Sequence, residues 1–167
     1  MPIAAVTHIP GRRGFAAGLL AAGVAALGLL LPVWAHADGL EKLATFSNGG
    51  QELTVAIYTE DDQTVGLVGI KATDGKRVSI TFNNKEMQTF IALVQKARGM
   101  DSDKWAEAGS FSETETSSPS HIVVYGGPSL QFSLTDPSIG GYSYTLDTGD
   151  IAGFADALAQ AEQRVHP

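Results

Sequence analysis

The alternation of apolar and polar residues between Thr64 and Arg98 predicts two strands followed by an amphipathic helix. The two strands are separated by residues 73–76, Thr-Asp-Gly-Lys, a hairpin turn with the favoured Asp-Gly pair. Asn83 can cap the following helix, Glu86 is placed to complete a capping box, and Gly99 marks its end. A stripe of apolar residues at helical spacing completes the pattern, namely Met87, Phe90, Ile91, Val94 and Ala97.

The same pattern returns 64 positions later without a gap. This shift places apolar strand and helix positions on one another: Val68 on Phe132, Ile70 on Leu134, Val78 on Tyr142, Met87 on Ile151, Phe90 on Phe154 and Val94 on Leu158. Most of these matches preserve the class of the residue and not its identity. The pattern therefore fits either an internal duplication or two similar supersecondary units.

Further strands are expected from the period of two in several other segments. They are residues 53–58, 110–116, 121–126, 129–135 and 142–147. Residues 38–48 fit either the start of a short helix or an edge strand. Ile151 to Val165 form a second helical stripe, with Asp147 and Asp150 as expected caps. We therefore expect an α+β fold with antiparallel sheets, in which two strand-rich units are each closed by an amphipathic helix.

Residues 1–37 have the pattern of a bacterial export signal and are left out of the fold. Arg12 and Arg13 precede an uncharged apolar run over residues 15–35, and a small-x-small cleavage site ends at Ala37. The paired arginines resemble the twin-arginine signal, although the general secretory route and an uncleaved anchor remain alternatives. We expect a periplasmic or secreted single domain of residues 38–167, with no stable membrane insertion after cleavage. Its halves would cover residues 38–100 and 101–167.

The charge of residues 38–167 disfavours nucleic acid as a partner. Of the 11 basic residues, two precede the cleavage site, so nine remain against 18 acidic residues and the formal charge is −9. Strand-rich repeats closed by a helix resemble, in topology alone, the PUR type of nucleic-acid-binding module. That resemblance implies binding to phosphate backbones, which requires a basic surface that this composition does not supply. No disulfide can form because the chain has no cysteine.

The titratable residues offer few candidates for a metal or catalytic site. Asp101, Asp103 and Glu107 could supply oxygen ligands to a cation, but the spacing departs from an EF-hand loop and a solvated turn is the alternative. The same holds for the turn of residues 60–62, Glu-Asp-Asp. His121 is the imidazole that could act as a catalytic base, or it could simply bond a neighbouring group at the start of a strand. We expect no cofactor.

Aromatic residues are the remaining candidates for ligand binding. Tyr125, Tyr142 and Tyr144 could line a groove for a sugar or a peptide, together with Trp105, or could serve ordinary strand packing. The sequence favours an exported, non-catalytic protein that binds a protein, peptide or envelope ligand through a sheet face or the polar edge at 110–118. The alternative is a small periplasmic hydrolase or isomerase that uses His121 or an acidic cluster.

Overall fold

The computed structural model describes residues 39–100, 103–114 and 116–165. The predicted export signal and Asp101 lie outside these residues. Eight strands and two α-helices make up the described chain. They are β1 (Leu40–Asn48), β2 (Gln51–Glu60), β3 (Gln63–Lys71), β4 (Arg77–Phe82), α1 (Asn84–Arg98), β5 (Ala106–Ser112), β6 (His121–Gly126), β7 (Leu130–Asp136), β8 (Gly140–Leu146), a short 3-10 helix η2 (Thr148–Asp150) and α2 (Ile151–Arg164).

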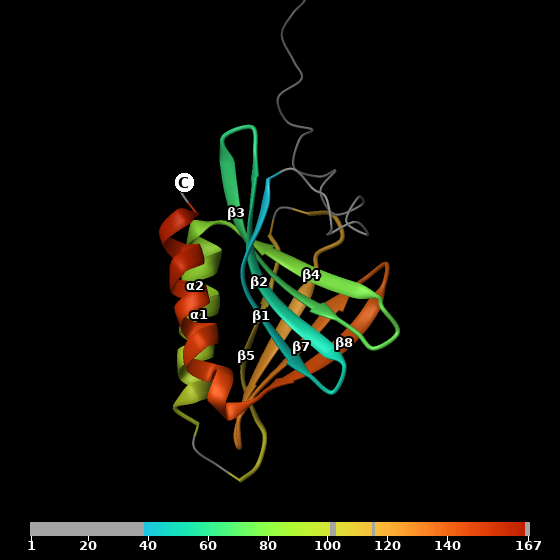
Figure 1. Ribbon diagram of the computed structural model, residues 1–167, viewed down its shortest axis with the longest axis vertical. Coiled ribbons are helices and arrows are strands. Elements are labelled where there is room, and N and C mark those ends of the chain that lie inside the picture. Colours follow the sequence, from blue (N-terminus) through green and yellow to red (C-terminus); the bar gives the residue numbers. More distant parts are fainter. Residues whose placement is uncertain (1–38, 101–102, 115, 166–167) are drawn as a thin grey trace, which may run out of the picture.

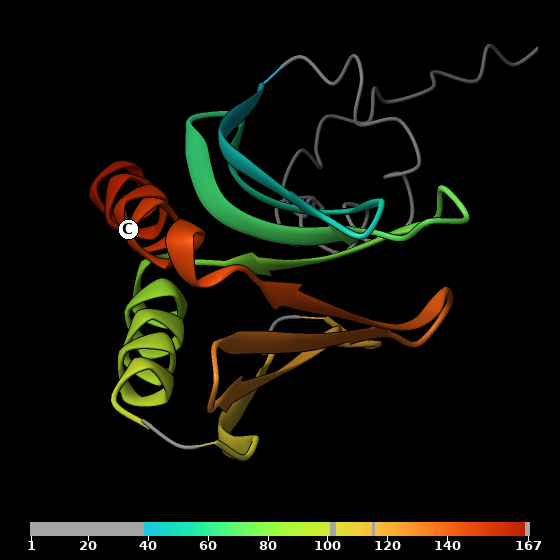
Figure 2. The ribbon, with the colours of Figure 1, turned by 60° about the horizontal axis from the view of Figure 1, so that its bottom comes forward.

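The strands form two four-stranded antiparallel sheets, which confirms the predicted α+β class. The first sheet has the order β1-β2-β3-β4 and the second has the order β5-β6-β7-β8. Figure 2 shows the two sheets lying one over the other, with both helices on the side where the sheets diverge. Within the ambiguous segment 38–48, residues 40–48 form β1, which pairs with β2 and has an irregularity between Lys42 and Ala44.

Both halves have the same order of elements, four strands and then a helix. In the last hairpin of each half the pairing is also related by 64 positions, since Gly66 pairs with Phe82 and Leu130 pairs with Leu146. The second strands do not follow this offset, because Ile70 pairs with Leu53 whereas Leu134 pairs with Ile122. The origin of the halves by duplication stays a prediction.

The predicted capping box starts α1. The amide of Glu86 donates to Asn83 Oδ1 at 3.0 Å, and the amide of Asn83 donates to Glu86 Oε2 at 2.9 Å. The second helix differs from the prediction, because Asp150 makes no side-chain capping bond. Asp147 also does not cap; its Oδ1 accepts a hydrogen bond from Asn48 Nδ2 at 3.1 Å. The 3-10 turn η2 leads into α2 instead.

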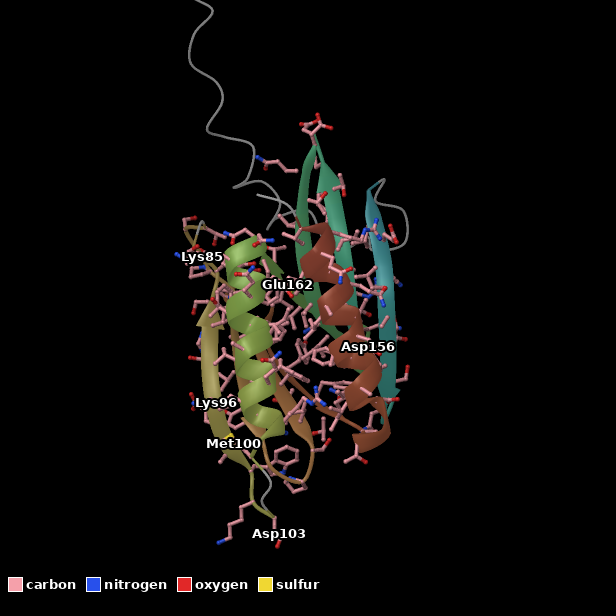
Figure 3. The ribbon with its side chains drawn as sticks, turned by 90° about the vertical axis from the view of Figure 1, so that its left-hand side faces the viewer. Lys85, Lys96, Met100, Asp103, Asp156 and Glu162 are labelled. Carbon is pink, nitrogen blue, oxygen red and sulfur yellow. The ribbon has the colours of Figure 1, made fainter. Side chains whose placement is uncertain are left out.

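The two helices lie side by side and run in opposite directions (Figure 3). The start of α1 is joined to the end of α2 by Asn84 Nδ2, which donates to the carbonyl of Val165 at 2.7 Å. Each helix packs mainly on the sheet of the other half: α1 on β5 and β6, and α2 on β1 and β2 (Figure 1). At Gly126, a side chain would collide with the carbonyl of Ala97, so α1 approaches the backbone of β6 closely.

A chain of phenylalanine rings connects both sheets and both helices through one core. Phe132 of β7 lies 6.4 Å from Phe90 of α1 and 5.0 Å from Phe154 of α2, measured between ring centroids. Phe90 stacks on Phe82 of β4, and Phe154 meets the edge of Phe46 of β1. The predicted helical stripes therefore do face sheets, but the core that they fill belongs to both halves at once.

Among the described residues, no helix combines the length and the apolar character required to cross a membrane.

A candidate binding face on the second sheet

The outer face of the second sheet, turned away from the core, is built from three complete rows of side chains. The pairing of β5, β6, β7 and β8 defines each row, because residues directly opposite each other share a face. The rows are Glu107-Tyr125-Gln131-Thr145, Ser110-Val123-Ser133-Ser143 and Ser112-His121-Thr135-Gly141. We call these twelve positions the hydroxyl face, since seven of them carry a hydroxyl group.

None of the hydroxyl face is fully buried. The residues of the central strands β6 and β7 are half-buried by their neighbours in the sheet, except for Thr135, which is exposed, and those of the edge strands are mostly exposed. The hydroxyl face has one carboxylate, that of Glu107 at one corner, and it has no lysine or arginine. This face is therefore an open, almost uncharged polar surface on a chain with a strong negative charge.

The rim of the hydroxyl face beside β8 is fixed by side chains from the first sheet. Asn48 Nδ2 donates to the carbonyl of Thr145 at 3.0 Å, and Gln51 Nε2 donates to the carbonyl of Ser143 at 3.1 Å. The turn between β1 and β2 thus satisfies carbonyls on the free edge of β8. This edge is closed to strand addition at these two residues.

His121 lies in the third row and is hydrogen-bonded to a serine on the neighbouring strand. Its Nδ1 lies 2.7 Å from Ser112 Oγ, and the two residues are paired directly across β5 and β6. Among the described residues, no carboxylate is hydrogen-bonded to the ring. A serine beside a histidine base is one part of a nucleophilic site, but the pair stands on an open sheet face and not in a cleft.

The three tyrosines do not line a common groove. Tyr125 belongs to the hydroxyl face, whereas Tyr144 points into the core, where it is paired with Phe132 and is only 1% exposed. Tyr142 also faces inward, at the edge of the core, and its hydroxyl lies 3.5 Å from Asp74 Oδ2 on the β3–β4 turn. The alternation of β8 places Tyr142 and Tyr144 on one face, and the pairing of β6 places Tyr125 on the other.

The hydroxyl group of Tyr144 has no hydrogen-bond partner among the described residues. Burial, followed by the negative charges of Asp147 and Asp150, raises the pKa of Tyr144 to about 12. Tyr144 therefore stays neutral at physiological pH, and its ring serves the core.

The remaining predicted candidates lie at separate places. Trp105 immediately precedes β5 and is 42% exposed, so it forms part of the surface beside the hydroxyl face. Asp103 and Glu107 are both exposed, and Asp101 lies outside the described residues. The carboxylates of the β2–β3 turn are exposed as well. The described part of the chain holds no group of three or more carboxylate, histidine or cysteine side chains suited to a metal ion.

No known family model matches the chain, and no curated protein sequence matches it either. Its function is therefore inferred from the geometry of its surfaces.

The sequence indicated His121, Tyr125 and Glu107 as candidates, and the polar edge 110–118 that it also indicated contains Ser110 and Ser112. The seven other positions of the hydroxyl face were not identified. The serines and threonines of β7 and β8 match no catalytic or binding motif. Their alternation with buried residues was a usable signal, because it places all of them on the face opposite to the core. What the alternation could not give was the register that brings them into rows.

Proposed function

We propose that this protein is an exported, non-catalytic binding protein that recognises an uncharged polar ligand of the cell envelope, a glycan, through the hydroxyl face. The observation that carries the proposal is the composition of the three rows, in which hydroxyl and amide groups replace charges across a whole open sheet face. Export rests on the leader pattern of residues 1–37.

The chemistry of the rows suits a sugar chain. Hydroxyl and amide groups both donate and accept hydrogen bonds, as sugar hydroxyls do. Tyr125 adds an aromatic ring with a polar tip, which can cover the apolar side of a sugar ring. An open face suits an extended ligand better than a small molecule, which usually requires a concave pocket. The absence of lysine and arginine from the face, and its single carboxylate at a corner, argue against a charged ligand.

The proposal can be tested with a panel of uncharged oligosaccharides. We expect the full chain to bind at least one member, and Tyr125→Ser to weaken that binding about tenfold, the usual cost of losing a central aromatic contact. Gln131→Glu places a charge beside Tyr125 and should also weaken it. Gln163→Glu makes the same exchange on an exposed position of α2 and serves as the matched control. Equal binding by all four proteins would refute the proposal.

A hydrolase is the second candidate, favoured by the 2.7 Å contact between Ser112 Oγ and His121 Nδ1. An activated aryl ester is a suitable probe, because its good leaving group reveals even a weak nucleophile. If the pair is catalytic, the rate of hydrolysis above that in buffer is lost in both Ser112→Ala and His121→Ala. Oligosaccharide binding by the same variants is measured separately. Under the binding proposal, neither variant changes the rate of ester hydrolysis.

A further inference from the structure

The two central strands of the hydroxyl face lead into a hollow at one end of the second sheet. The turn of residues 127–129 joins β6 to β7 and forms one wall of this hollow. Tyr125 and Gln131, which belong to the first row of the face, lie two residues before and two residues after the turn. That separation is about 7 Å along each strand. A ligand that follows the strands across the face therefore reaches the hollow, which we call the end hollow.

The end hollow is large enough for a small ligand group. Its volume is about 360 Å³, which lies at the lower end of the range of roughly 300 to 1,000 Å³ for ligand pockets in proteins. Three parts of the chain line it, namely the end of α1, the β6–β7 turn, and the start of α2 with the 3-10 turn before it. The open face can hold the length of a glycan chain, and the end hollow can hold one sugar at the end of that chain.

The lining of the end hollow combines an apolar surface with a few polar groups. The apolar side chains are those of Ala97, Leu130, Ile151 and Ala152. The guanidinium group of Arg98 can only donate hydrogen bonds. Ser129 Oγ donates its proton to the carbonyl of Leu146, so it is left to accept a hydrogen bond from a ligand. The end hollow thus offers a donor, an acceptor and an apolar surface in one place.

We propose that the end hollow binds an N-acetylated amino sugar at the end of the glycan that lies on the hydroxyl face. This assignment rests on the proposed function, because the glycan supplies the sugar. The carbonyl of an acetamido group accepts from Arg98, its N–H donates to Ser129 Oγ, and its methyl group packs on the apolar side chains. A hydroxyl group at the same carbon has no methyl group to bury. The acetamido group is also uncharged, as the composition of the hydroxyl face requires.

The experiment compares chitotriose with cellotriose by calorimetry on the full chain. The two trisaccharides differ only in the acetamido group that replaces one hydroxyl group on each sugar. We expect chitotriose to bind at least about tenfold more tightly. Equal Kd values would overturn the assignment and leave the proposed function standing. If neither trisaccharide binds, the assignment fails, and the panel of uncharged oligosaccharides decides separately whether the proposed function fails as well.

Two pairs of variants locate the binding of the acetamido group, and the first pair removes a cation at either end of α1. Arg98→Met should weaken chitotriose binding about tenfold, as expected for the loss of one hydrogen bond from a charged donor. Lys85→Met is the control, because Lys85 lies at the other end of α1 (Figure 3), and it should leave both Kd values unchanged. Tyr125→Ser should weaken the binding of both trisaccharides by the same factor, since its ring lies on the open face.

The second pair fills the end hollow without touching the core. Ala152 and Ala159 are both exposed, and they lie seven residues apart on the same side of α2. Only Ala152 lines the hollow. Ala152→Phe should therefore abolish the preference for chitotriose, and Ala159→Phe should keep it. An unchanged preference in both Arg98→Met and Ala152→Phe, or an equal loss in a variant and its control, would overturn the assignment.

Discussion

Each helix packs mainly on the sheet of the other half, an arrangement that we call the exchange of helices. Phe132 is the residue through which it can be tested most directly. Its side chain is fully buried, and its ring lies between Phe90 of α1 and Phe154 of α2. Phe132→Ala removes the ring and leaves a cavity between both helices. The variant should lose about 4 kcal/mol of unfolding free energy, within the range measured for buried phenylalanines. Domains of this size are stable by about 5 to 15 kcal/mol, so the loss is a large part of the total.

The assay combines urea unfolding, followed by circular dichroism, with amide hydrogen exchange at α1 and α2. Because α1 packs mainly on the second sheet and α2 on the first, neither half can unfold while the other keeps its core. We therefore expect a single transition at a lower urea concentration. The amides of both helices should lose the same free energy of protection, since both would open with the whole domain.

Val123→Ala is the control on a neighbouring strand of the same sheet. Val123 lies on the hydroxyl face and is only half-buried, so its truncation should cost no more than about 1 kcal/mol. The reasoning is refuted if Phe132→Ala unfolds in two separate transitions. It is also refuted if the protection of one helix falls while that of the other is unchanged, because the halves would then have independent cores.

Two further predictions concern single titratable groups. Arg164 donates two hydrogen bonds to Glu41 and lowers the pKa of that carboxyl below 4.5. The ion pair therefore stabilises the fold fully above pH 4.5. Its contribution disappears as the pH falls through the lower pKa that Glu41 has in the folded state. Glu41→Gln should therefore show a smaller loss of stability below pH 4.5, as measured by urea unfolding across an acid series; an unchanged acid profile would show that the pair contributes nothing. Tyr144→Phe removes a buried hydroxyl that has no partner among the described residues, so we expect unchanged stability or a gain of about 1 kcal/mol. Alkaline titration followed by tyrosine absorbance should at the same time lose the group with a pKa of about 12, and a clear loss of stability would reveal a hydrogen bond to this hydroxyl.

Local patterns in the sequence determined most of the secondary structure. The alternation in β3 and β4, the Asp-Gly turn and the Asn83–Glu86 capping box depend on residues close together in the chain, and the structure has all of them. The predicted cap of α2 was wrong because the bond that Asp147 makes depends on a residue far away in the chain. Asp147 bonds Asn48, which is 99 residues away, and no local pattern reports such a contact.

Tertiary structure decided which surfaces meet and which remain open. Alternation showed that Tyr142 and Tyr144 share a face, but only the pairing of β6 with β7 and β8 placed Tyr125 on the opposite one. The spacing of apolar residues in the sequence also showed that each helix has an apolar stripe, but it did not show which sheet that stripe covers. Both stripes and both inner sheet faces are apolar, so the hydrophobic pattern alone does not select which helix covers which sheet. The exchange of helices follows from the fit of particular side chains, such as Phe132 between Phe90 and Phe154, and this fit exists only once the whole chain has folded.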